Sequence, residues 1–197
     1  MMLIEETVVP SGALPMATMK RHLRMGSGFD EDDVQDEMLQ SFLRAAMAAI
    51  EARTGKALLS RNFVWTVHDW RDPEGVALPI APVESLTQLS VVDRFGAAET
   101  VEPNRYRLEA DPHAPRLRPQ GASLPTIPTG GAAELRFVAG YSGSFDGLPA
   151  DLAQAVLLLA AHYYEYRHET ALGQGCMPFG VTSLVARYRP MRLGFGA

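Results

Sequence analysis

The sequence predicts an α+β fold: a helical core, an inserted antiparallel β-rich lobe and an extended C-terminal tail. Apolar residues recur at helical spacing in two long segments and alternate at strand spacing between them. Prolines separate the strand-like pieces, which favours short antiparallel strands over βαβ units. We expect 1–169 to form a single domain, with its helical core at 14–56 and 148–169 and its β-rich insertion at 60–141. A partner-binding tail, 170–197, follows.

Two helices are predicted before the β-rich insertion, after ten residues that look extended. Pro15 fits the first turn of a short helix over Met16–Met25. A long helix, about 30–54, begins at Asp30, which caps it in a run of acids that complements the helix dipole. Gly55 fits its C-cap. Phe29 is placed to form a hydrophobic staple with Val34, and one broad face carries Val34, Met38, Phe42, Ala45, Ala49 and Ile50.

Strand-like alternation begins after Ser60, where Phe63, Trp65 and Val67 alternate with Val64, Thr66 and His68. A turn is expected at Arg94–Gly96, and the Pro- and Gly-rich segment Asp111–Gly131 is expected to be a long loop. Further short strands are predicted around Leu86–Val92, Glu99–Val101, Tyr106–Leu108, Arg116–Arg118 and Ala133–Ala139.

A last long helix is predicted at about 149–169, with Pro149 at its first position. Apolar residues surround it almost completely between Leu152 and Ala161. Such a helix must be buried on several sides, either by its own fold or by neighbouring subunits. The residues predicted for subunit packing are Leu152, Val156, Leu159 and Tyr163.

The segment from Thr170 to Ala197 combines large apolar side chains with three arginines, five glycines, two prolines and no acid. Gly and Pro disfavour helices and strands, so we expect an extended segment whose apolar side chains are covered by a partner. The residues predicted to bind that partner are Phe179, Val181, Leu184, Val185, Arg187, Tyr188, Arg189 and Arg192.

Charge and composition limit the function classes. The formal net charge is −5, and the three tail arginines leave −8 on the rest of the chain, which argues against a general nucleic-acid binder. The single cysteine, Cys176, excludes an intrachain disulfide. The first residues lack the features of a secretion signal and the longest apolar run is too short to cross a membrane, so we expect a soluble protein made inside the cell.

No catalytic, metal or cofactor site is predicted. His162, Glu165 and His168 point in directions that one helix cannot bring to a single metal. The segment Gly140–Ser144 superficially resembles a hydrolase nucleophile elbow, but it has Ser144 where that motif needs glycine. Gly26 and Gly28 are not followed by the residues of a phosphate loop, the acids at 30–33 lack calcium-loop spacing, and Cys176 has no nearby fixed base.

Several segments, in order along nearly the whole chain, resemble the head–tail connectors, or neck adaptors, of tailed phages, and among these the adaptor of phage-like gene transfer agent particles. The matching segments are Met19–Arg24, Ile50–Leu58, Leu78–Leu86, Phe137–Tyr141, Leu148–Leu152, His162–Arg167, Pro178–Val181 and Leu184–Pro190. The final Met191–Ala197 departs from that pattern, and no role is predicted for Gly194–Ala197.

The resemblance implies a structural, non-enzymatic protein without a cofactor. Such adaptors form a dodecameric ring beneath the portal protein, bind the portal through their C-terminal segments and receive a stopper protein on the other side. DNA passes through the lumen without sequence-specific binding, and no membrane is involved. The expected location is the neck of a virion or phage-like particle assembled in the bacterial cytoplasm.

On this interpretation Phe179–Leu193 is mobile in the free subunit and becomes ordered on the portal. Its apolar side chains fill pockets and its arginines meet acidic groups or carbonyls, while Asp30–Asp33 face the lumen. Alternatives are another neck component, such as a stopper-like or tail-completion protein, an intracellular enzyme with a dispersed site, or a DNA-binding accessory factor.

Overall fold

The computed structural model describes residues 1–25, 33–167 and 177–189. The chain divides into two compact units, which are described separately. The β unit contains Met1–Val9 and Leu59–Gly143, and the helical unit contains the described parts of Pro10–Leu58 and Ser144–Ala197. The mixed α+β character predicted from the sequence is confirmed, whereas the grouping of 1–169 into a single domain stays a prediction.

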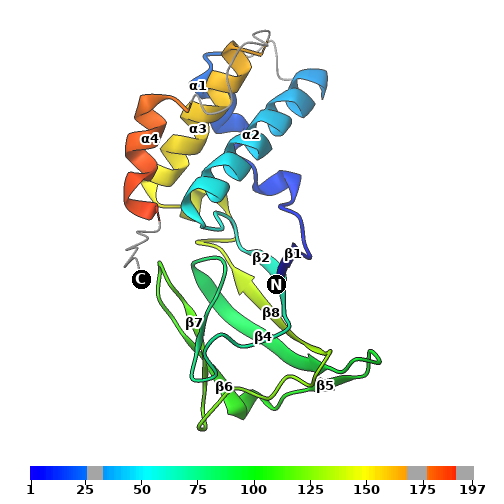
Figure 1. Cartoon of the computed structure of the whole chain (residues 1–197). Coiled ribbons are helices and arrows are strands. Elements are labelled where there is room, and N and C mark those ends of the chain that lie inside the picture. The colour runs from blue at the N-terminus through cyan, green and yellow to red at the C-terminus, as the bar shows by residue number, and fades with distance from the viewer. Residues whose placement is uncertain (26–32, 168–176, 190–197) are drawn as a thin grey trace. The chain divides into compact units, whose positions relative to one another are not determined.

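Four α-helices make up the described part of the helical unit (Figure 1). They are α1 (Met16–His22), α2 (Asp33–Thr54), α3 (Ala150–Glu165) and α4 (Phe179–Val185), with 3-10 turns at Ser11–Ala13, Phe145–Gly147 and Ala186–Tyr188. Helix α3 packs against the other three. Its nearly continuous apolar surface is therefore covered by its own chain. The fully buried core of this unit includes Met19, Leu39, Leu43, Ile50, Leu152, Val156 and Leu159.

The end of α2 agrees with the sequence prediction, whereas the described ends of α1 and α3 depart from it. Gly55 has a φ of 67° and donates its N–H to the Glu51 carbonyl at 2.8 Å, as expected of a left-handed C-cap. Pro15 and Pro149 both occupy the N-cap, so Pro15 precedes the first turn predicted for it and Pro149 precedes the predicted first position. Helix α3 ends at Glu165, four residues before the predicted end. The start of the long helix at 30–32 and the Phe29–Val34 staple lie outside the described residues and side chains.

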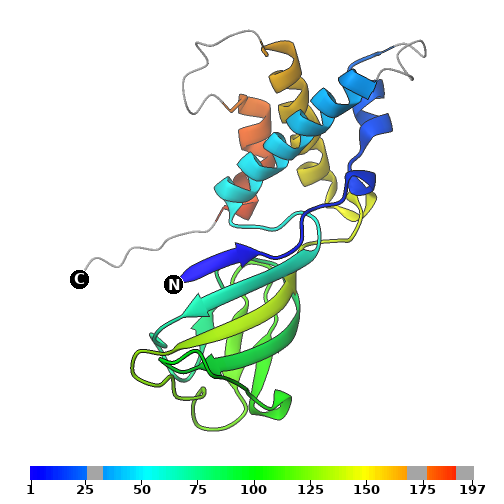
Figure 2. The ribbon, with the colours of Figure 1, turned by 90° about the vertical axis from the view of Figure 1, so that its right-hand side faces the viewer.

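Two antiparallel sheets make up the β unit (Figure 2). The larger sheet has the order β1-β2-β8-β4-β5, and the smaller has the order β3-β7-β6. The strands are β1 (Met2–Glu5), β2 (Arg61–Val67), β3 (Val76–Ala77), β4 (Val83–Val92), β5 (Ala98–Thr100), β6 (Tyr106–Glu109), β7 (Arg116–Pro119) and β8 (Ala132–Ala139). Every predicted strand is present. Strand β3 was not predicted, because two residues are too few to show a period.

The larger sheet is built around β8, whose residues alternate between buried and half-buried along the whole strand. Phe137 lies opposite Phe63 on β2, and their rings stack with centroids 5.7 Å apart. Trp65 lies opposite Leu135 on the same face. Gly140 follows the strand directly, and a Cβ added to it would lie 2.4 Å from the backbone of Ser60, so only glycine fits.

The predicted loop Asp111–Gly131 contains β7, and the residues after β7 are held to the rest of the β unit by specific contacts. The Trp70 indole Nε1 donates to the Pro125 carbonyl at 2.7 Å, and the Leu124 amide donates to Pro73 at 2.8 Å. Leu124 itself is buried. The absence of regular structure after β7 therefore does not imply an unattached segment.

The extended conformation predicted for the C-terminal segment is wrong for 179–188. Pro178 precedes α4, and a 3-10 turn at Ala186–Tyr188 follows the helix directly. Val181, Val185 and Tyr188 are buried and stand at positions i, i+4 and i+7, one face of a helix. Only one glycine, Gly180, lies within α4; the other four glycines counted in the tail lie outside the described residues.

Candidate functional site

The residues predicted to bind a partner through the C-terminal segment fall into two groups. Phe179 is 85% exposed at the first turn of α4, and Arg187 and Arg189 are also exposed. Val181, Val185 and Tyr188 are instead buried within the subunit, and Leu184 is half-buried. The first group can meet a partner in this conformation, Leu184 can do so in part, and Val181, Val185 and Tyr188 cannot. Arg192 lies outside the described residues.

A polar clasp of three residues, Asp151, Arg187 and Tyr188, joins the 3-10 turn after α4 to the start of α3. The Tyr188 hydroxyl donates to Asp151 Oδ1 at 2.7 Å and accepts from Arg187 Nη2 at 2.6 Å. Arg187 Nη2 also lies 2.8 Å from Asp151 Oδ2. The clasp and the buried face of α4 act together, since both hold α4 and the 3-10 turn after it on α3.

The clasp changes the titration of its members. Desolvation, followed by the hydrogen bond to Asp151, raises the pKa of Tyr188 above its usual value near 10. The hydrogen bond to Tyr188, together with the charge of Asp151, raises the pKa of Arg187. Tyr188 therefore remains a neutral donor at physiological pH, which maintains its hydrogen bond to the Asp151 carboxylate.

The four residues predicted for subunit packing lie on α3. Leu152, Val156 and Leu159 are fully buried inside one chain, so its own fold accounts for them and they present no surface to a neighbouring copy. Tyr163 is half-buried, and its burial raises its pKa. Of the two explanations left open by the apolar helix, burial by its own fold is the one that describes α3. A contact of Tyr163 with a neighbouring subunit stays a prediction.

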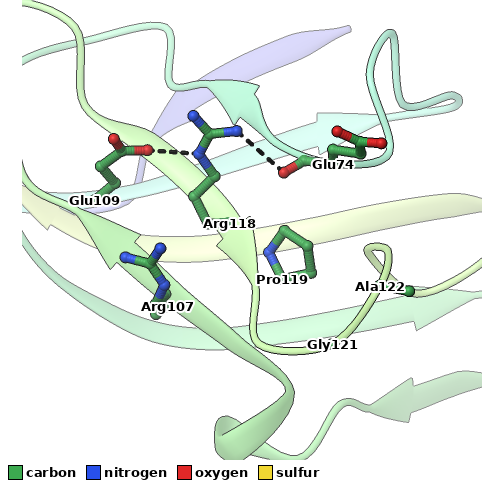
Figure 3. A pocket seen from close by; sticks show the side chains of 7 residues that line it. All are labelled: Glu74, Arg107, Glu109, Arg118, Pro119, Gly121 and Ala122. Carbon is green, nitrogen blue, oxygen red and sulfur yellow. Dashed lines mark hydrogen bonds and ion pairs between the residues drawn. The ribbon is translucent and has the colours of Figure 1, made fainter.

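The β unit has a polar hollow of about 330 Å³ on its smaller sheet (Figure 3). Arg118 on β7 donates Nε to Glu109 Oε2 on β6 and Nη1 to the Glu74 carbonyl at 3.2 Å. The Arg118 hydrogen bond lowers the pKa of Glu109, with smaller contributions from Arg107 and Arg116. These contacts join two strands and a loop. They give Glu109 a low pKa, the opposite of what a general acid needs.

The other sequence motifs do not form a site in the described residues. His162 lies beside Tyr166, with ring centroids 4.6 Å apart and ring planes tilted by 47°, and the described part of the chain has no group of three or more potential metal ligands. Gly140–Ser144 connects β8 to the helical unit, and the Ser142 carbonyl accepts from the Ser60 amide at 2.8 Å. Gly26, Gly28, Asp30, His168 and Cys176 lie outside the described residues.

No helix in the described ranges is both long and apolar enough to cross a membrane. The described residues thus contain interaction surfaces and a structural clasp. Within these residues, the motif considered for metal binding is a histidine packed beside Tyr166, and the motif considered for catalysis is a connection after β8.

Comparison with solved structures decides the family. A chain in a structure described as the neck of an empty gene transfer agent (GTA) particle computed with C6 symmetry is 50% identical, with a TM-score of 0.90, over 100% of this chain and 99% of the other. This chain belongs to the head–tail connector, or neck adaptor, family. A chain from the virion of a native GTA particle is 49% identical, with a TM-score of 0.88, at the same coverage.

A third chain, from the neck of a native GTA particle computed with C12 symmetry, is 47% identical with a TM-score of 0.84, again over 100% of this chain and 99% of that one. No family model matches the sequence, and no curated protein matches it. The adaptor's role is that of a structural neck component. The resemblance read from short sequence segments is confirmed across the full length of the chain.

Sequence reasoning missed two features of this adaptor. The first is the clasp, because the helix dipole alone explains an acid such as Asp151 near the start of a helix. The arginines of 170–197, however, have no acid in their own segment with which to pair. The second is the run of exposed apolar residues on β1 and directly before it, because an apolar pattern in the sequence does not show that a strand lies at the edge of a sheet. Met1, Met2 and Ile4 are 77%, 54% and 45% exposed.

Proposed function

We propose that the chain is the adaptor that joins the portal to the rest of the neck. In this proposal twelve copies form a closed ring. The observation that carries this proposal is the identity of about half of all residues, at full coverage, with chains from GTA necks. The C6 and C12 symmetries stated for those necks are consistent with six or twelve copies in a ring. Cyclic assembly needs a head-to-tail interface between two different surface patches.

The portal is the proposed partner of the C-terminal segment, through the exposed residues of α4 and the residues that follow. Phe179 offers an aromatic anchor, and Arg189 adds a positive charge near it in sequence. Val181, Val185 and Tyr188 act indirectly, because they fix α4 on α3 and so limit the directions in which Phe179 can point. Less conformational entropy is then lost on binding than in the fully mobile segment expected from the sequence.

Multiple subunits strengthen this contact. A single aromatic side chain with one or two arginines gives weak binding, but the second and later segments of a ring bind at a high effective concentration. The stopper protein is proposed to bind the opposite side of the ring. DNA is proposed to pass through the lumen without sequence-specific contacts, and the acidic balance of the chain outside its tail is suited to a channel that does not retain DNA.

The function is tested in a producing strain that lacks this chain. The expected result is DNA-filled heads without tails, and restoration of tails when the wild-type chain is supplied. Phe179→Asp should restore tails poorly, whereas the exposed Ser183→Ala on the same helix should restore them fully. Normal tailed particles in the complete absence of the chain would contradict the connector role, and full activity of Phe179→Asp would contradict only the assigned portal contact.

A further inference from the structure

Strand β1 is a sheet edge on which three apolar residues precede a single acid, Glu5. All four of its residues are exposed, and among the described strands it pairs only with β2. Natural edge strands commonly carry charges or proline that discourage pairing with another chain. Here the acids at the end of the edge are held by their own sheet: Glu5 pairs with Arg61 at 2.8 Å, and Glu6 pairs with Arg136 at 3.3 Å. Met2, Leu3 and Ile4 remain available to a partner.

A cavity of about 510 Å³ adjoins this edge inside the β unit. Met1 lies at its margin together with Trp65 of β2, Val76 and Ala77 of β3, and Pro79. Trp65 is 2% exposed, yet its indole Nε1 has no acceptor among the described residues. The indole nitrogen is itself buried, so the cavity offers a partner its apolar walls together with the charged side chains of Asp69, Arg71, Asp72 and Arg116.

The opposite end of the same sheet carries a projecting aromatic side chain. Strand order places β5 and its hairpin at the far edge from β1 (Figure 1). At the hairpin tip Phe95 is 80% exposed, with the Arg94 guanidinium 4.6 Å from its ring centroid. Asp93 Oδ1 accepts from the amides of Phe95 and Ala97, at 2.8 and 2.9 Å. These hydrogen bonds hold the backbone of the tip, while the Phe95 ring stays largely exposed beside the Arg94 guanidinium.

We propose that neighbouring copies join through these two patches: the Phe95 hairpin of one copy docks on the β1 edge and the adjoining cavity of the next. The two patches differ, lie at opposite ends of one sheet and belong to one compact unit, which is the arrangement that a head-to-tail ring contact requires. Phe95 supplies an aromatic anchor, and β1 and the apolar part of the cavity wall supply the surface that receives it. This inference rests on the proposed ring.

The contact is tested by photo-crosslinking in assembled particles. Benzoylphenylalanine replaces Phe95, and particles are built from a mixture of isotopically light and heavy chains so that crosslinks between copies are distinguished from those within a copy. The expected links join position 95 of one copy to residues 1–5 or 65–79 of another. Links to any other part of a neighbouring copy, or to other neck proteins, or no link at all, would overturn the contact.

Substitutions give an independent measurement. Phe95→Asp and Ile4→Asp should each reduce the yield of tailed particles at least about tenfold, the loss expected for a central interface side chain. The conservative Phe95→Leu and Ile4→Val should remain near wild type, and circular dichroism should show that all four variants fold. If both acidic variants enter a normal ring, the contact is wrong while the connector function stands. If the wild-type chain is absent from the neck, the connector function itself fails.

Discussion

The attachment of α4 to α3 can be measured through one buried methyl-bearing side chain, Val185. The residue is fully buried, and Val185→Ala removes two of its methyl groups. At about 0.8 kcal/mol for each buried carbon, the transfer term is about 1.6 kcal/mol, and the cavity raises the loss to about 2 kcal/mol. Alanine is the better helix former by about 0.5 kcal/mol, which leaves a net loss of about 1.5 kcal/mol.

The matched control is Ser183→Ala, which lies on the exposed side of the same helix. It receives a similar gain in helix propensity without a cavity, so α4 should become more stable by up to about 0.5 kcal/mol. The two variants should therefore change the stability of α4 in opposite directions. Hydrogen exchange resolves them at the amides of Thr182, which donates to Pro178 at 3.0 Å, and Ala186, which donates to Ser183.

If α4 opens locally before exchange, Val185→Ala should accelerate exchange at these amides about tenfold, since about 1.4 kcal/mol corresponds to a factor of ten. Ser183→Ala should slow it slightly. Equal exchange in the two variants would refute the packing of α4 on α3, and with it the argument that a fixed helix orients Phe179 toward the portal.

Three further predictions concern the fold. Gly140→Ala should lower the free energy of unfolding by about 2 kcal/mol or more, because its Cβ meets the Ser60 backbone, whereas Gly143→Ala, with open space around it, should not; urea unfolding of the two measures the difference. Tyr188→Phe should weaken the clasp by about 1–2 kcal/mol at neutral pH. Because the folded-state pKa of Tyr188 is raised, the stabilisation is complete below about pH 10 and is lost as the pH rises through that pKa, so α4 amide protection should fall in alkali in the wild type and not in Tyr188→Phe. Trp70→Phe should remove the hydrogen bond to Pro125 and accelerate exchange of the Leu124 amide, and unchanged exchange would show that this bond does not hold the loop.

The sequence predicted the elements whose periodicity is long or whose ends are marked. Gly55 at the end of α2 and the alternating residues of β2 and β8 are examples, because one residue type or one period decides each of them. It did not predict α4, because the glycines and prolines of the whole segment 170–197 indicated an extended chain. The helical spacing of Val181, Val185 and Tyr188 was given less weight than that composition. Composition averaged over a segment concealed a short helix that tertiary packing stabilises.

The contacts of the candidate surfaces were less predictable than the elements. The family was recognisable from ordered short segments, but the clasp joins residues 151 and 188, whose proximity depends on how α4 packs. Likewise, the exposure of β1 depends on its position at the end of the sheet, and the same apolar residues would be core in a central strand. Strand order is a tertiary property that local periodicity does not contain.

The connector function is tested most directly by electron cryomicroscopy of necks from particles assembled with this chain. The expected map shows a closed ring of the chain, twelve copies in the dodecameric arrangement, between the portal and the next neck protein, with DNA density along its axis in filled particles. A neck of normal structure in which no density fits this chain would contradict the account.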